Sequence, residues 1–135
     1  AAEQTYGRAP KRLIHLGTYN CRRIAAYPTW LSEHGLGNAI DIAGFDFGAL
    51  KRGESLPDGV PKSLRRPFSV RVERNWKPGR SKAQQLHAIF LRRVIRILLD
   101  KRPFRVLLGP GYPGHHNHFH FDCAPFRMVE GFDDL

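Results

Sequence analysis

Residues 115–123 read HHNHFHFDC, and their alternation predicts the strand around which the candidate site is built. Side chains two positions apart share a face of a strand, so His118, His120 and Asp122 lie on one face and the two phenylalanines lie on the other. The phenylalanines suit the core, while the imidazoles face a cleft. We therefore expect the last strand, residues 118–123, to carry the chemistry of the protein.

Other stretches predict the elements that surround this strand. β-branched and aromatic residues in alternation predict strands over residues 12–22, 39–47, 68–76 and 104–108. Ser81 and Gln84 form a capping box ahead of an apolar stripe, so we expect a helix that begins there and ends before Pro103. Segment 48–67 is punctuated by glycine and proline and predicts a long loop, and the tail after residue 124 is expected to be weakly ordered.

Length and charge limit the classes of protein. A chain of 135 residues predicts one domain, residues 1–135, and is too short for two. No apolar run approaches the roughly 18 residues of a membrane helix, so we expect no membrane span. Lysine and arginine number 22 against 12 acidic residues, which leaves a net charge of +10 and predicts an anionic partner. Nucleic acid, an acidic cell-wall polymer and an anionic membrane surface all satisfy this charge.

A second histidine-containing stretch supplies further metal ligands. Residues 32–41 read SEHGLGNAID, and their glycines allow a tight turn that brings His34 toward Asp41. Asp41 lies between two isoleucines, and a carboxylate among buried residues is costly unless it is paired or bound to a metal. His34, Asp41 and His120 form a set of two nitrogens and one oxygen. This set suits Zn²⁺ with a fourth position open for water.

These two stretches resemble a known family of metallopeptidases. Ser32-x-His34-x-x-Gly37-x-Ala39-x-Asp41 and His118-x-His120 are similar to the lysostaphin, D-alanyl-D-alanine peptidase and hedgehog-type domains. Segments 19–22, 31–44 and 115–123 resemble more closely the bacterial extensin-like C-terminal domain family. The resemblance implies an α+β fold, in which flanking helices accompany a small antiparallel sheet that carries a zinc site. It also implies hydrolysis of cell-wall peptides.

Roles are carried over from the family position by position. The resemblance implies that His34, Asp41 and His120 bind zinc and that His118 is the general base or orients the attacking water. His115 is similar to the extra histidine in the His-x-x-His-x-His pattern of penicillin-insensitive murein endopeptidases.

One position departs from the carboxypeptidase branch of the family, which has a glutamate three residues before the last ligand. Asn117 stands there, and an amide cannot accept a proton at neutral pH. The departure favours the endopeptidase-like arrangement. Arg22 lies near the position of an arginine in the carboxypeptidases. The resemblance implies that Arg22 stabilises an oxyanion or holds a carboxylate, and the alternative is that Arg22 is a surface residue.

The chain has two cysteines, Cys21 and Cys123, each next to a predicted site residue. Without a Cys-x-x-Cys pair they are weak evidence for a zinc site, so we expect a disulfide between the first and last strands and an oxidising compartment. His15 and His87 are expected to be packing or surface histidines.

The expected function is that of an exported, periplasmic or wall-associated zinc D,D-endopeptidase. Its partners are then peptidoglycan cross-link peptides and an anionic wall polymer, with no nucleic acid, and we expect a monomer. A basic metal-dependent nuclease is the first alternative, because the His-His-Asn-His run superficially matches HNH nucleases. A zinc-containing wall-binding module without hydrolytic activity is the second.

Overall fold

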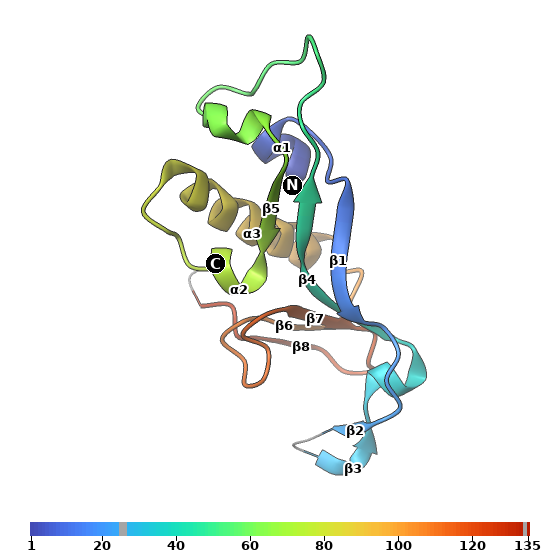
Figure 1. Ribbon diagram of the computed structural model, residues 1–135. Helices are drawn as coiled ribbons and strands as arrows, with labels where there is room; N and C mark the ends of the chain where they lie inside the picture. Colours follow the sequence, from blue (N-terminus) through green and yellow to red (C-terminus); the bar gives the residue numbers. More distant parts are fainter. Residues whose placement is uncertain (25–26, 134) are drawn as a thin grey trace.

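The computed structural model describes residues 1–24, 27–133 and 135, and it is a mixed α+β structure (Figure 1). In chain order the elements are α1 (Ala2–Tyr6), β1 (Arg12–Gly17), β2 (Arg23–Ile24), β3 (Tyr27–Leu31), η1 (Glu33–Leu36), β4 (Ala39–Phe47), η2 (Lys62–Arg65), β5 (Phe68–Arg71), α2 (Val72–Asn75), α3 (Lys82–Lys101), β6 (Val106–Leu108), β7 (Phe119–Asp122) and β8 (Met128–Glu130).

Strand β4 organises the main sheet because it pairs with three other strands. The order is β1-β4-β7-β6-β8, and β5 also pairs with β4. Residues 39–42 of β4 pair with β7, whereas residues 44–47 pair with β5. At the change of partner, a Cβ on Gly44 would collide with the carbonyl oxygen of Val70. Only glycine permits β5 to approach β4 this closely.

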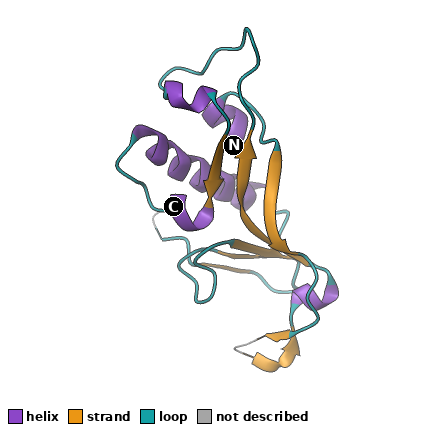
Figure 2. Ribbon diagram, viewed as in Figure 1, coloured by secondary structure: helices purple, strands orange, loops and turns teal. Residues whose placement is uncertain are grey.

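Helix α3 covers one face of this sheet, and the core lies between them (Figure 2). The predicted capping box is confirmed, since the Ser81 hydroxyl accepts from Gln84 N–H and the Gln84 side chain accepts from Ser81 N–H. The apolar stripe of α3 buries Phe90, Leu91 and Ile95. Phe119 and Phe121 of β7 belong to the same core, which leaves the polar face of β7 for the site.

Several expectations need correction. The predicted strand over 68–76 ends at Arg71 and continues as α2, and the strand over 12–22 ends at Gly17. Residues 128–132 of the tail are ordered, because β8 pairs with β6 and Phe132 packs on Trp76 with ring centroids 5.9 Å apart. The β6–β8 pair is parallel, so the sheet is not purely antiparallel.

The expected disulfide is also absent. Cys21 and Cys123 are both free and exposed. Backbone hydrogen bonds hold the residue before Cys21 to His34 and Cys123 itself to Asn38, at opposite ends of the η1 segment. Two free cysteines give no indication of an oxidising compartment.

The two remaining predicted histidines differ in environment. His15 is exposed on β1, and His87 of α3 is buried, where its Nδ1 lies 2.8 Å from the hydroxyl of Tyr6. Both agree with surface or packing roles. None of the helices in the described part of the chain is long and apolar enough to cross a membrane.

Candidate metal centre

The first ligand candidate, His34, is placed by the short helix η1. The Ser32 hydroxyl accepts a hydrogen bond from His34 N–H, and Gly37 ends the turn with a φ of 71°. This left-handed conformation favours glycine, so the predicted glycine turn is confirmed. The His34 side chain is 2% exposed and points into the protein.

The other two candidates face each other across β4 and β7. Asp41 and His120 are directly paired in the sheet, so their side chains share a face. Asp41 Oδ1 lies 2.9 Å from His120 Nδ1 and 3.1 Å from His34 Nε2, and the two ring nitrogens are 3.1 Å apart. The structure thus brings together all three side chains predicted as ligands.

Neighbouring groups decide which ring nitrogens face this cluster. His34 Nδ1 lies 3.2 Å from the carbonyl oxygen of Thr18, which can only accept, so His34 carries its proton there. His120 Nε2 likewise donates to Asp122 Oδ2 at 2.8 Å. Because a neutral imidazole has one donor and one acceptor nitrogen, His34 Nε2 and His120 Nδ1 present lone pairs to the cluster.

Three lone-pair atoms within 3.1 Å of one another repel unless a cation lies among them. A proton on His120 or a metal ion can fill this role. Zinc bonds of about 2.0–2.1 Å bring ligand atoms to similar separations, and carboxylate with imidazole is an ordinary zinc set. The Thr18 and Asp122 oxygens are the kind of outer hydrogen-bond partners that orient metal-bound histidines. The residues therefore fit a divalent ion.

The electrostatics of the cluster also favour a cation. Burial lowers the pKa of His120, but hydrogen bonds with Asp122 and Asp41 and their charges outweigh it and raise the pKa to about 9. Burial raises the pKa of Asp41, yet the hydrogen bond with His120 and the nearby imidazoles bring it below its ordinary value. Both shifts stabilise positive charge between these side chains.

Two further histidines border the cluster. His118 Nε2 lies 3.5 Å from Asp41 Oδ1, and His118 Nδ1 donates to the side-chain oxygen of Asn117 at 2.7 Å. Burial lowers the pKa of His118 despite the opposing charge of Asp41, so its Nε2 is an available base at neutral pH. The His115 ring lies 4.8 Å from that of His118 and 5.6 Å from that of His120, between centroids.

Arg22 is exposed and has no described side-chain contact with the cluster. Its carbonyl oxygen accepts from Ser32 N–H, and its charge is close enough to contribute to lowering the pKa of His115. Burial is the main cause of that lowering. The structure places Arg22 beside the candidate site and not within it.

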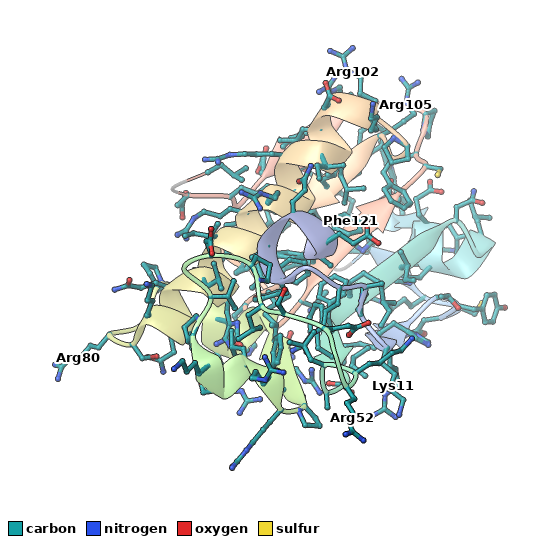
Figure 3. All side chains as sticks on the ribbon, turned by 90° about the horizontal axis from the view of Figure 1, so that it is seen from above. Lys11, Arg52, Arg80, Arg102, Arg105 and Phe121 are labelled. Atoms are coloured by element: carbon teal, nitrogen blue, oxygen red, sulfur yellow. The ribbon has the colours of Figure 1, made fainter. Side chains whose placement is uncertain are left out.

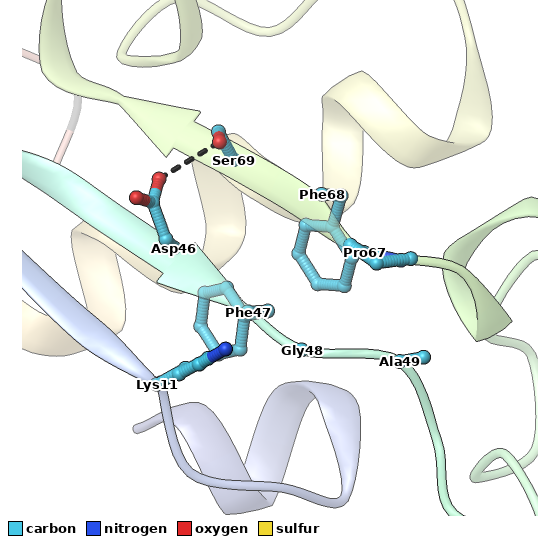
Figure 4. A pocket seen from close by; sticks show the side chains of 8 residues that line it. All are labelled: Lys11, Asp46, Phe47, Gly48, Ala49, Pro67, Phe68 and Ser69. Atoms are coloured by element: carbon cyan, nitrogen blue, oxygen red, sulfur yellow. Dashed lines mark hydrogen bonds between the residues drawn. The ribbon is translucent and has the colours of Figure 1, made fainter.

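A separate hollow lies at the far end of β4, around Asp46 (Figure 4). It has a volume of about 390 Å³ and is open to solvent. Asp46 is five residues from Asp41, which separates the two by roughly 16 Å along the strand. Asp46 is paired with Arg12 and Arg71 and accepts from Ser69, so this carboxylate is already satisfied. The hollow is no part of the candidate metal centre.

Comparison with known protein families gives one match. The family described as extensin-like protein C-terminus matches residues 1–130. The chain belongs to this family. All of the candidate metal ligands of this extensin-like chain lie inside the match. No curated protein and no solved structure matches it.

Sequence reasoning found the three ligand candidates of this extensin-like chain but assigned no supporting role to Asp122, Asn117 or the Thr18 carbonyl. Asp122 shares a face with His120, so strand periodicity already indicated the contact. Asn117 was recognised only as a residue unable to act as a base, and it instead orients His118. The Thr18 contact uses a main-chain oxygen, which every residue has, so the sequence does not indicate it.

Proposed function

We propose that the protein is a zinc-dependent peptidoglycan hydrolase that cleaves peptide cross-links as a D,D-endopeptidase. The observation that carries this proposal is the convergence of His34 Nε2, Asp41 Oδ1 and His120 Nδ1, with His118 Nε2 beside them. The resemblance to lysostaphin and D-alanyl-D-alanine peptidase domains, given above, supports cell-wall peptides as the substrate.

A divalent ion bound by His34, Asp41 and His120 would act as a Lewis acid toward a carbonyl and would lower the pKa of water. Mixed imidazole and carboxylate ligands suit zinc better than magnesium or calcium, which prefer oxygen. Deprotonated ligands are required, so the ion competes with the proton that His120 otherwise holds.

The remaining residues supply proton transfer and binding. Asn117 holds the His118 proton on Nδ1, which leaves Nε2 free to accept a proton from the attacking water. The resulting imidazolium can return that proton to the departing amine. His115 lies against both His118 and His120, where its ring can donate to a developing oxyanion. Arg22 would hold a substrate carboxylate beside the site.

The cellular setting is part of the proposal. Peptidoglycan lies outside the cytoplasmic membrane, so the protein would act there after export. A net charge of +10 would retain it on an anionic wall.

The test measures metal content and hydrolysis together. We expect one zinc per chain, and conversion of purified cross-linked muropeptide dimers to monomers by the zinc-loaded protein. His120→Ala should lose both properties, whereas His118→Ala should keep the zinc and lose turnover by a factor of at least about 100. His116→Ala, at an exposed position in the same stretch, is the matched control and should behave as the unchanged protein.

Other results would favour the alternatives. Zinc bound at one per chain with intact dimers would indicate a wall-binding module. Nicking of duplex DNA that is lost in His120→Ala would indicate a nuclease.

A further inference from the structure

The β2–β3 hairpin exposes large aromatic side chains beside the candidate metal centre. All five residues of β3 are exposed, with Tyr27 at 61% and Trp30 at 56%. Six of the ten exposed large hydrophobic residues within the described part of the chain lie between positions 16 and 36. Exposed large hydrophobic residues concentrated in one segment of a protein this polar are typical of an interaction site.

The two rings are held in a defined arrangement. Tyr27 and Trp30 have ring centroids 5.9 Å apart and planes inclined by 37°, so they do not stack face to face and cover each other. Arg23 of β2 donates to the carbonyl oxygen of Thr29 at 3.1 Å, so its guanidinium is held on the β3 strand that carries both rings. The hairpin therefore presents two flat aromatic surfaces together with positive charge.

Backbone hydrogen bonds connect the hairpin to the segment that carries His34. Ser32 N–H donates to the Arg22 carbonyl oxygen at 3.0 Å, and Asn20 N–H donates to the His34 carbonyl oxygen at 3.0 Å. Trp30 is four residues from His34, which limits the distance between their Cα atoms to about 14 Å. In Figure 1 the hairpin projects from the body of the protein next to η1. A chain bound at the metal centre can thus reach the rings.

The chemistry of this surface fits an anionic sugar chain. A pyranose ring has a flat face of C–H groups and a polar rim, and amphipathic aromatic rings accept such a surface well. Arg22 and Arg23 can donate to the hydroxyl and N-acetyl oxygens of the sugars, and they complement the carboxylates of those muramic acids that carry no peptide. A second copy of the chain is a poor occupant, because each copy carries a net charge of +10 and the two would repel each other.

We infer that Tyr27 and Trp30 bind the glycan strand of the wall polymer whose peptides reach the metal centre. The inference rests on the proposed function for one point, namely that the peptides of the same polymer enter the metal centre. Glycan binding itself requires no hydrolysis, so it can be measured alone.

The test uses fluorescent glycan strands freed of their peptides, in which cleavage of the peptide amide leaves each muramic acid with a free carboxylate. All measurements are made in a His118→Ala background, so turnover does not affect binding. We expect Trp30→Ala and Tyr27→Ala each to weaken binding by roughly tenfold, Trp30→Phe to retain most of it, and Ile89→Ala to leave it unchanged. Ile89 is 48% exposed on α3 and is the matched control. Neutral chitin oligosaccharides of equal length should bind more weakly than the carboxylate-bearing strands.

Three outcomes would overturn the inference. The first is glycan binding that is unchanged in both alanine variants. The second is binding to vesicles containing anionic lipid that depends on Trp30 while glycan binding does not, which would assign the hairpin to a membrane surface. The third is a dimer in sedimentation that Trp30→Ala dissociates, which would assign it to a second copy. Failure of peptide hydrolysis with intact glycan binding would contradict the proposed function and leave this inference standing.

Discussion

Each imidazole in the cluster has its proton placed by an atom outside the cluster. The identities of His34, Asp41 and His120 could be predicted, because histidine and aspartate at these spacings are recognisable in the sequence alone. Their orientation depends on Asp122 and on a backbone oxygen. Strand periodicity makes the first contact foreseeable, but the second exists only once the loop after β1 has folded.

At the residue scale, Asp122→Asn should weaken zinc binding by about ten- to a hundredfold. Asp122 accepts from His120 Nε2 with one oxygen and from Ala124 N–H with the other, and an amide has only one oxygen for both. Loss of the carboxylate also makes His120 a weaker ligand. Titration against a chelator measures the affinity, and Asp100→Asn, at an exposed position, is the control. Equal affinities in the two variants would contradict this role.

The carboxylate of Asp46 predicts a pH-dependent contribution to stability. Hydrogen bonds from Ser69 and Arg71 lower its pKa from 3.8 to about 2. Because the pKa is lower in the folded state, the stabilisation is present above pH 3.8 and is lost as the pH falls through about 2. Asp46→Asn should therefore cost about 1 kcal/mol at pH 7, a value reduced by solvent screening, and less at pH 3.

Urea denaturation at the two pH values tests this prediction. Asp58→Asn, at an exposed position in segment 48–67, serves as the comparison and should change stability little at either pH. A cost of Asp46→Asn that does not shrink at pH 3 would show that the carboxylate acts by packing and not by charge.

At the element scale, predictions succeeded where a local signal was strong. Helix α3 has a capping box and a long apolar stripe, and β4 was predicted with its observed bounds, 39–47. The stretch 68–76 was misassigned because its apolar residues satisfy two periods. Phe68, Val70 and Val72 alternate as in a strand, but Val72 and Trp76 are four apart, as on one helix face. Strand β8 depends on pairing with β6 and has no comparable local signal.

The close approach of β4 and β5 predicts a strong effect of one methyl group. Gly44→Ala should destabilise the protein by about 3 kcal/mol, because the added Cβ meets the Val70 carbonyl oxygen and neither strand can move without breaking the pairing. Gly17→Ala on β1 is the matched control, since a Cβ there meets no atom within 4 Å. Thermal or urea unfolding of both variants gives the comparison. Similar stabilities would mean that β5 shifts freely.

At the scale of the whole molecule, positive charge is spread over the surface. Figure 3 shows Arg52, Arg80, Arg102 and Arg105 reaching outward, and all four lie in segments that connect the helices and strands. Composition alone predicts a positive surface potential. It does not predict the partner, because many different anions are attracted to positive charge. The proposed metal centre and the proposed glycan-binding hairpin would supply the specificity that net charge lacks.

Metal binding should stabilise the entire fold, because the ligands come from η1, β4 and β7. With free zinc at a hundred times its dissociation constant, the free energy of unfolding should rise by about 2.7 kcal/mol. The rise should disappear on addition of a chelator and be absent in His120→Ala. Magnesium at equal concentration is the comparison and should have little effect. A zinc-induced rise that persists in His120→Ala would place the ion elsewhere.

The contact between Thr18 and His34 has a consequence for how the centre tolerates change. Every amino acid contributes a carbonyl oxygen to the main chain, so exchanging the side chain at position 18 leaves that acceptor in place. The counterpart at position 122 is a side chain and disappears with a single substitution. One of the two supports is thus protected from point mutation, and it can be lost only through a change in the path of the backbone itself.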